Sequence, residues 1–252
     1  MSTMFSRTKT IGVLFLAALF LPTGCASKLP VYAWSGPDSA LLTMSLKSAD
    51  ITTLACDCVI QLGNSEGETI VLDGVLYSRA PDELRMAGWK FSERVFDLLV
   101  AGGRSWIYLS SKVGDHAGSD NGLDAIDADR FASMWRYATG EIDHDRVVSI
   151  DDDGGPSFEV SMEGDDEGVL LVYQIDKATL TVQEISIGTD GMVSYLLRLG
   201  GYEVISDIVW PTRISGAGED GSFKVRMSDV ELNSSLPKTT FKPSSKMRMQ
   251  SK

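Results

Sequence analysis

Few residues in this chain could build a metal site or a catalytic centre. The 252 residues include 2 His and 3 Cys. His116 and His144 lie in polar surroundings, with neither a nucleophile elbow nor a Gly-rich phosphate loop nearby. A zinc site or a His-centred catalytic group is difficult to assemble from so few ligands. We therefore expect no enzyme activity, no bound metal and no cofactor.

Two acidic clusters have the residue types of a calcium loop without its spacing. Residues 151–155 read Asp-Asp-Asp-Gly-Gly and residues 165–168 read Asp-Asp-Glu-Gly. A calcium loop of the Asp-x-Asp-x-Asp-Gly type needs an acidic residue at its fifth position and Gly at its sixth, where the first cluster has Gly155 and Pro156. The sequence therefore predicts solvated turns at both places.

Cys56 and Cys58 lie two residues apart in an alternating stretch. On a strand they would project from the same face, with Asp57 on the other. Neighbouring positions of this kind do not favour a mutual disulfide, and Cys-x-Cys is not the Cys-x-x-Cys redox motif. We expect two buried structural thiols.

The charge balance excludes general nucleic-acid binding. The chain has 23 Lys plus Arg against 35 Asp plus Glu, a net charge of −12 and a pI near 4.6. Phosphate binding needs the basic charge that this chain lacks. The C-terminal residues are basic and have no acidic neighbours, and residues 243–252 are expected to form a basic flexible tail.

The N-terminus has the organisation of a secretory signal. Arg7 and Lys9 precede an apolar run over residues 11–21 that is too short to span a bilayer. The run ends in Leu-Pro-Thr-Gly-Cys, which resembles the cleavage box of bacterial lipoproteins, with Gly24 and Cys25 matching and a Pro where Leu is usual. The resemblance implies that residues 1–24 are removed, that Cys25 is diacylated, and that residues 25–37 form a linker. An ordinary signal peptide with an accidental Cys is the alternative.

The remaining chain reads as mainly β (α+β). Leu41, Leu42, Met44 and Leu46 have the spacing of a short amphipathic helix after residue 38. Alternation of period two, with short Gly- or Pro-containing connections, predicts an antiparallel meander interrupted by a helix over residues 123–138. The expected strands are residues 53–62, 69–79, 83–89, 94–101, 105–110, 147–150, 157–162, 168–175, 181–187, 192–199, 202–208 and 222–232.

Several of these segments together resemble the LolA/LolB superfamily of bacterial lipoprotein carriers and receptors. The likeness is carried by residues 74–86, 95–100 and 105–109, then by Trp-Pro-Thr-Arg-Ile at 210–214 and the Leu-Pro turn before a Phe within 233–241. It covers roughly residues 38–242. The resemblance implies a strongly curved antiparallel sheet, an unclosed β-barrel, whose concave face is covered by an α-helical lid over a cavity for acyl chains.

The cavity reading has some support from the residues themselves. Residues 95–100 are apolar on both faces of a strand, so both faces of that part of the sheet must be covered. A solid core remains the alternative for these side chains, and a core helix remains the alternative for the lid. The candidate lid and cavity residues are Leu123, Ile126, Phe131, Met134, Trp135, Trp89, Phe96, Leu98 and Trp106.

The resemblance implies a lipid-anchored periplasmic lipoprotein of the outer membrane that binds acyl chains for transport or membrane insertion. Its partners would be the acyl chains of lipids or lipoproteins, a periplasmic carrier protein, and the membrane through the lipidated Cys25. Ala26 after that Cys implies sorting to the outer membrane. The alternative is a non-catalytic envelope interaction or sensor protein that uses the half-barrel as a docking surface.

Overall fold

The computed structural model describes residues 28–110, 135, 137, 142–189, 191–219 and 221–250. The predicted signal peptide and Cys25 lie outside the described residues, and so does His116. The same is true of four of the candidate lid residues, Leu123, Ile126, Phe131 and Met134.

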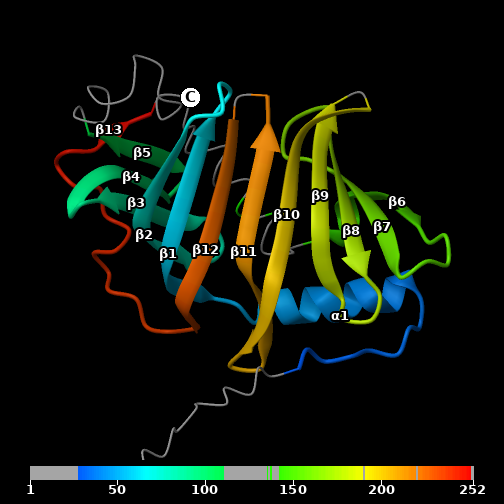
Figure 1. The fold of residues 1–252 in the computed structure, drawn as a ribbon. Coiled ribbons are helices and arrows are strands. Elements are labelled where there is room, and N and C mark those ends of the chain that lie inside the picture. The colour runs from blue at the N-terminus through cyan, green and yellow to red at the C-terminus, as the bar shows by residue number, and fades with distance from the viewer. Residues whose placement is uncertain are drawn as a thin grey trace, which may run out of the picture.

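One antiparallel sheet of 13 strands makes up most of the described structure, in the order β13-β5-β4-β3-β2-β1-β12-β11-β10-β9-β8-β7-β6. The sheet is not closed, and both of its ends curl behind the central strands in Figure 1. The elements are α1 (Pro37–Ala49), β1 (Thr53–Asn64), β2 (Thr69–Arg79), β3 (Glu83–Lys90), β4 (Glu93–Ala101), β5 (Arg104–Leu109), η1 (His144–Arg146), β6 (Val147–Asp151), β7 (Ser157–Glu163), β8 (Val169–Asp176), β9 (Thr181–Thr189), β10 (Met192–Ile205), β11 (Ile208–Gly218), β12 (Gly221–Leu232) and β13 (Arg248–Met249).

The chain order explains how the two halves of the sheet meet. Strands β1 to β5 form one meander and β6 to β12 form a second, as the short connections predict. The first and last of these strands then pair with each other, with Ile60 of β1 opposite Val225 of β12. The chain therefore passes from one edge of the sheet to the other between β5 and β6, and returns strand by strand to the centre.

Tight turns hold the meanders together. The β4–β5 connection is Gly102-Gly103, and both residues have positive φ, 57° and 69°. This is the backbone of a two-residue hairpin turn whose twist matches that of the flanking strands, and Gly adopts it without a steric penalty. The Gly pair predicted as a turn is thus confirmed.

The second Gly pair, Gly200-Gly201, is not the predicted turn. Strand β10 continues through it, and the chain turns at Ser206-Asp207, which have φ of 49° and 68°. Gly201 has φ of 61° inside the strand, so the Gly marks a local irregularity and not its end. The following strand, β11, was not predicted as a strand of its own.

Glycines also allow the curvature of the sheet. Gly74 of β2 and Gly88 of β3 are cross-strand partners. A Cβ at Gly74 would lie 2.5 Å from Ile60 Cδ1, and one at Gly88 would lie 2.5 Å from Phe96 Cε1. Large neighbouring side chains therefore fill the space above these glycines, which lets the strands bend inward over the core.

Helix α1 lies across the ends of the strands in the β6–β12 half, behind the sheet in Figure 1. The predicted helix is confirmed, but its buried stripe is not the predicted one. Leu41 and Met44 are buried, whereas Leu42 and Leu46 are 58% and 64% exposed. Residues three and four apart share a face, and Ala40, Leu41 and Met44 are the set that faces the sheet.

The opposite, convex face is covered locally by the C-terminal segment. Asp97 of β4 is fully buried there and accepts two hydrogen bonds from Arg85, at 2.9 and 2.7 Å. Arg85 also donates to the carbonyl oxygen of Thr240 at 2.8 Å, and the neighbouring Phe241 is buried. The expectation that residues 95–100 need cover on both faces is met in this way.

The predicted flexible tail differs from the structure in one respect. Arg248 and Met249 form β13, which pairs with the edge strand β5, and Gln250 N–H donates to the carbonyl of Ser105 at 3.0 Å. The unpaired backbone groups of an edge strand offer such a segment a partner. Arg248 of this basic segment is therefore part of the sheet.

Candidate functional site

The concave face of the sheet is the candidate site. Alternation along each strand turns one set of side chains toward this face, and the register aligns those sets across the sheet, as in Cys56↔Leu76 and Met86↔Leu98. The face forms one continuous apolar cluster with α1. Its buried members include Leu54, Ile60, Leu72, Leu84, Phe96, Phe158, Val160, Leu171, Tyr173, Ile185, Leu197, Ile214, Phe223, Val225 and Met227.

This face is electrically neutral among the described residues. Asp97 is the one described side chain that is both buried and formally charged, and it lies on the opposite, convex face with Arg85. The other buried polar side chains are Ser105, Thr181 and Thr212. Since an unpaired ion is costly to bury, a surface of this kind suits uncharged apolar ligands and not ionic ones.

Cys56 and Cys58 lie on the concave face as free thiols, both 5% exposed. The prediction of two buried thiols on one side of a strand, with exposed Asp57 opposite, is confirmed. Burial raises the pKa of both thiols, that of Cys58 to about 12, and the charge of Asp57 adds to the effect. Thiols held neutral in this way are poor nucleophiles and poor metal ligands.

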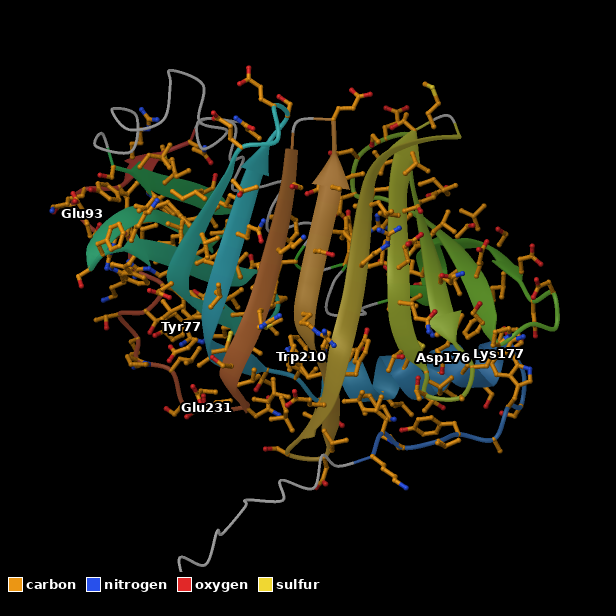
Figure 2. All side chains as sticks on the ribbon, in the orientation of Figure 1. Tyr77, Glu93, Asp176, Lys177, Trp210 and Glu231 are labelled. Atoms are coloured by element: carbon orange, nitrogen blue, oxygen red, sulfur yellow. The ribbon has the colours of Figure 1, made fainter. Side chains whose placement is uncertain are left out.

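Two tryptophans meet on the concave face. Trp210 of β11 is 2% exposed and Trp135, which has helical backbone, is 6% exposed. Their ring centroids lie 6.2 Å apart. Figure 2 shows Trp210 at the lower end of β11, at the level of α1. Within the described structure, neither indole N–H has a hydrogen-bond partner.

The structure brings some of the sequence-predicted site residues together and separates others. Phe96 and Leu98 lie on the concave face with Trp135. Trp89 and Trp106 alternate to the convex side, where Trp89 stacks with the Arg94 guanidinium, 5.3 Å from the ring centroid. Both are partly exposed and do not line the concave face. The alternation of β3 and β5 with Leu84 and Ile107 inward could have placed them.

Trp210 is the main member of the face that was absent from the predicted site. It lies in β11, where Pro211, Gly216 and Gly218 interrupt the apolar alternation. Because the alternation is weak here, hydrophobic periodicity does not predict this strand. Its neighbour Trp135 was included because the predicted helix around it had a clear stripe.

The acidic clusters behave as turns. Asp152 Oδ1 and Asp153 Oδ1 accept hydrogen bonds from the backbone N–H groups of Gly154 and Gly155, at 2.9 and 2.8 Å. Asp152 also pairs with Lys177, which lowers the pKa of its carboxyl. In the described part of the chain, no three His, Cys, Asp or Glu side chains converge on a potential metal position. No described helix is both long and apolar enough to cross a membrane.

The folded shape was compared with known proteins. No family model and no curated protein matches the sequence. Among solved structures, an outer membrane lipoprotein-sorting protein domain from Vibrio parahaemolyticus matches with a TM-score of 0.54 and 13% identity, over 81% of this chain and 97% of that one. A LolA superfamily protein from Nitrosomonas europaea matches with a TM-score of 0.52 and 14% identity, over 81% and 97%.

The chain has a LolA-like fold. A third structure agrees, that of a DUF1329 family protein from Desulfovibrio piger, with a TM-score of 0.55, 11% identity, and 81% and 95% coverage. The unclosed barrel with a helix against its concave face, expected from the resemblance in sequence, is therefore confirmed. In this LolA-like fold the concave face is the largest continuous apolar surface that the described residues bury.

Proposed function

We propose that this protein is a lipid-anchored periplasmic lipoprotein that holds the acyl chains of lipids or lipoproteins against the concave face of its LolA-like sheet. The observation that carries the proposal is the neutral, apolar character of that face across both meanders. Two of the matched structures are described as a lipoprotein-sorting domain and a LolA superfamily protein, which supports the same reading.

Hydrophobic burial is sufficient for such a function. Each buried methylene contributes about 0.8 kcal/mol, so ten methylenes give on the order of 8 kcal/mol, equivalent to a Kd near 1 μM before ordering costs. The interior of a bilayer offers an acyl chain a similar apolar environment. Binding and release are therefore close to balanced, and transfer to a membrane needs no covalent step.

The segment that contains Trp135 is the candidate lid. Trp135 contacts the concave face through Trp210, on the same side as α1. If this segment moves away, the apolar surface beneath it opens to a ligand. Leu123, Ile126, Phe131 and Met134 belong to the same proposed lid.

The anchor is the second part of the proposal. Diacylation of Cys25 supplies more than one acyl chain, which is enough for stable membrane attachment. Ala26 follows this Cys, and the outer membrane, facing the periplasm, is the proposed location. A periplasmic carrier protein is the proposed donor of the cargo.

Lipid that copurifies with the mature protein tests the proposal. Mass spectrometry of an organic extract should detect acyl lipid in stoichiometric amount, and delipidated protein should bind a fluorescent acyl probe with saturation. Convex-face substitution of Trp106 by Ala is the matched control and should leave probe binding intact. An extract without lipid, together with no probe binding, would contradict the proposal and favour a protein-docking role for the half-barrel.

A further inference from the structure

The buried indole pair, Trp135 and Trp210, places two hydrogen-bond donors side by side on the concave face. Both side chains are more than nine-tenths buried, and neither indole N–H has a partner in the described structure. Buried hydrogen-bond donors are nearly always satisfied, because an unsatisfied one forfeits the bond it makes to water in the unfolded chain. Two such donors lie on neighbouring rings whose centroids are 6.2 Å apart. Their position indicates that a ligand supplies the acceptor.

The surroundings restrict what that acceptor can be. The indole is a donor only, so the ligand must supply oxygen or nitrogen lone pairs. The buried side chains of the concave face carry no cation that could neutralise an anion, since the described Arg85 and its carboxylate partner lie on the convex side. A carboxylate or phosphate would therefore be buried without a counter-charge. A neutral carbonyl oxygen fits the donors and the neutral surroundings.

We propose that Trp135 and Trp210 form a carbonyl subsite that binds the ester or amide oxygen of an acyl chain. This inference rests on the proposed function and specifies its ligand: a neutral acyl ester or amide, in preference to a free fatty acid or a plain hydrocarbon. The hydrocarbon part packs along the apolar face, and the carbonyl takes up a fixed position at β11. The subsite sets the depth to which the chain enters.

The variant that isolates the donor is Trp210→Phe, which keeps an aromatic ring and removes the N–H group. Trp135→Phe makes the same change on the other ring. Trp106→Phe is the matched control, because Trp106 lies on the convex face. Three ligands of equal chain length are compared by displacement of a fluorescent acyl probe: methyl hexadecanoate, hexadecanoic acid and hexadecane.

A neutral hydrogen bond contributes a factor of about five to ten in affinity. We expect the wild-type protein to prefer the methyl ester over hexadecane and over the ionised acid. Each of the two Phe variants should lose about five- to tenfold in affinity for the ester, with its affinity for hexadecane changed less than twofold. The Trp106→Phe variant should bind all three ligands as the wild type does.

Indole ¹H–¹⁵N spectra of the folded wild type give a second readout that does not depend on the variants folding. The methyl ester should move the indole N–H resonances of both tryptophans downfield, and hexadecane should not. If the ester and hexadecane bind with equal affinity and have the same effect on the indole N–H resonances, the proposal of a carbonyl subsite is wrong. The two donors then bind water or have no partner. If the wild type binds none of the three, the proposed function itself fails, and the subsite with it.

Discussion

Replacing Asp97 by Ala should both destabilise the protein and release its C-terminal segment. Asp97 is fully buried on the convex face and accepts from Arg85 at 2.9 and 2.7 Å and from Arg94 at 2.7 Å. The same Arg85 donates to the carbonyl oxygen of Thr240. The carboxylate therefore fixes the guanidinium that holds residues after β12 against β3 and β4.

The magnitude follows from the burial of the two arginines. Arg85 is 16% exposed, so loss of its bidentate partner leaves a buried guanidinium uncompensated, which typically costs about 3–5 kcal/mol. Arg94 is 41% exposed, and a partner at such a position contributes about 1 kcal/mol or less. The Asp97→Ala variant should lose about 3–5 kcal/mol of unfolding free energy, and Arg94→Gln less than about 1 kcal/mol.

Urea unfolding measures the first effect and hydrogen exchange measures the second. Amides of β13 and residue 250 should exchange faster in Asp97→Ala, because the Arg85 contact to Thr240 loses its orientation. Combining the substitution with Arg85→Met should recover part of the stability, since the uncompensated charge is then removed as well. A loss below 1 kcal/mol, with wild-type protection at the C-terminus, would refute this account of the ion cluster.

Three further predictions concern the concave face and the anchor. Folding raises the pKa of the Cys56 and Cys58 thiols, so the stability that they contribute is complete below pH 9 and is lost as the pH rises above it. At pH 10 the loss is on the order of 1 kcal/mol per thiol. The variant with Ala at both positions should lack this part of the pH profile, keep lipid binding and cost about 1–3 kcal/mol at pH 7; an identical alkaline profile in both proteins would exclude the thiols as its source. Replacing Trp135 by Ser should lower acyl-probe affinity about ten- to a hundredfold with a smaller change in urea stability, because a lid side chain contacts ligand; a loss of about 3–5 kcal/mol of stability with unchanged affinity would identify a core helix instead. Replacing Cys25 by Ser should abolish incorporation of a fatty-acid label and release the protein from the membrane fraction, and persistent labelling of the variant would contradict the proposed anchor.

The sequence predicted those parts of the fold in which local pattern and tertiary role agree. Strands β1 and β2 alternate between buried and more exposed side chains, and the predicted limits of β1 to β5 were close to the observed ones. Strand β11 was not predicted because its Pro and Gly residues weaken the alternation. In addition, Gly201 has the residue type of a turn but forms an irregularity within β10. The local sequence pattern therefore gave wrong strand limits where the backbone conformation is unusual.

Long-range pairing set the limit for the candidate site. Arg85, the partner of Asp97, comes from the neighbouring strand β3, but the cover of the convex face comes from residues around Thr240, far away in the sequence. Alternation showed that both faces of β4 needed cover, but it could not indicate what would supply it. The contact of Trp135 with Trp210 is of the same kind, since 75 residues separate the two rings and only the tertiary fold brings them together.

The attachment of the N-terminal segment limits how far the domain can stand from a bilayer. Residues within the predicted linker are docked on the sheet: the Tyr32 N–H donates to the carbonyl of Ala178 at 2.8 Å, and the Trp34 ring packs against Phe158, with centroids 5.1 Å apart. With a lipid on Cys25, only the seven residues up to Tyr32 remain as a tether, which reaches roughly 25 Å when fully extended. A globular domain of this size is wider than that, roughly 45 Å across. If Cys25 carries the proposed lipid, the β8–β9 turn beside Lys177, near the start of α1 in Figure 2, lies on the side of the domain that faces the membrane.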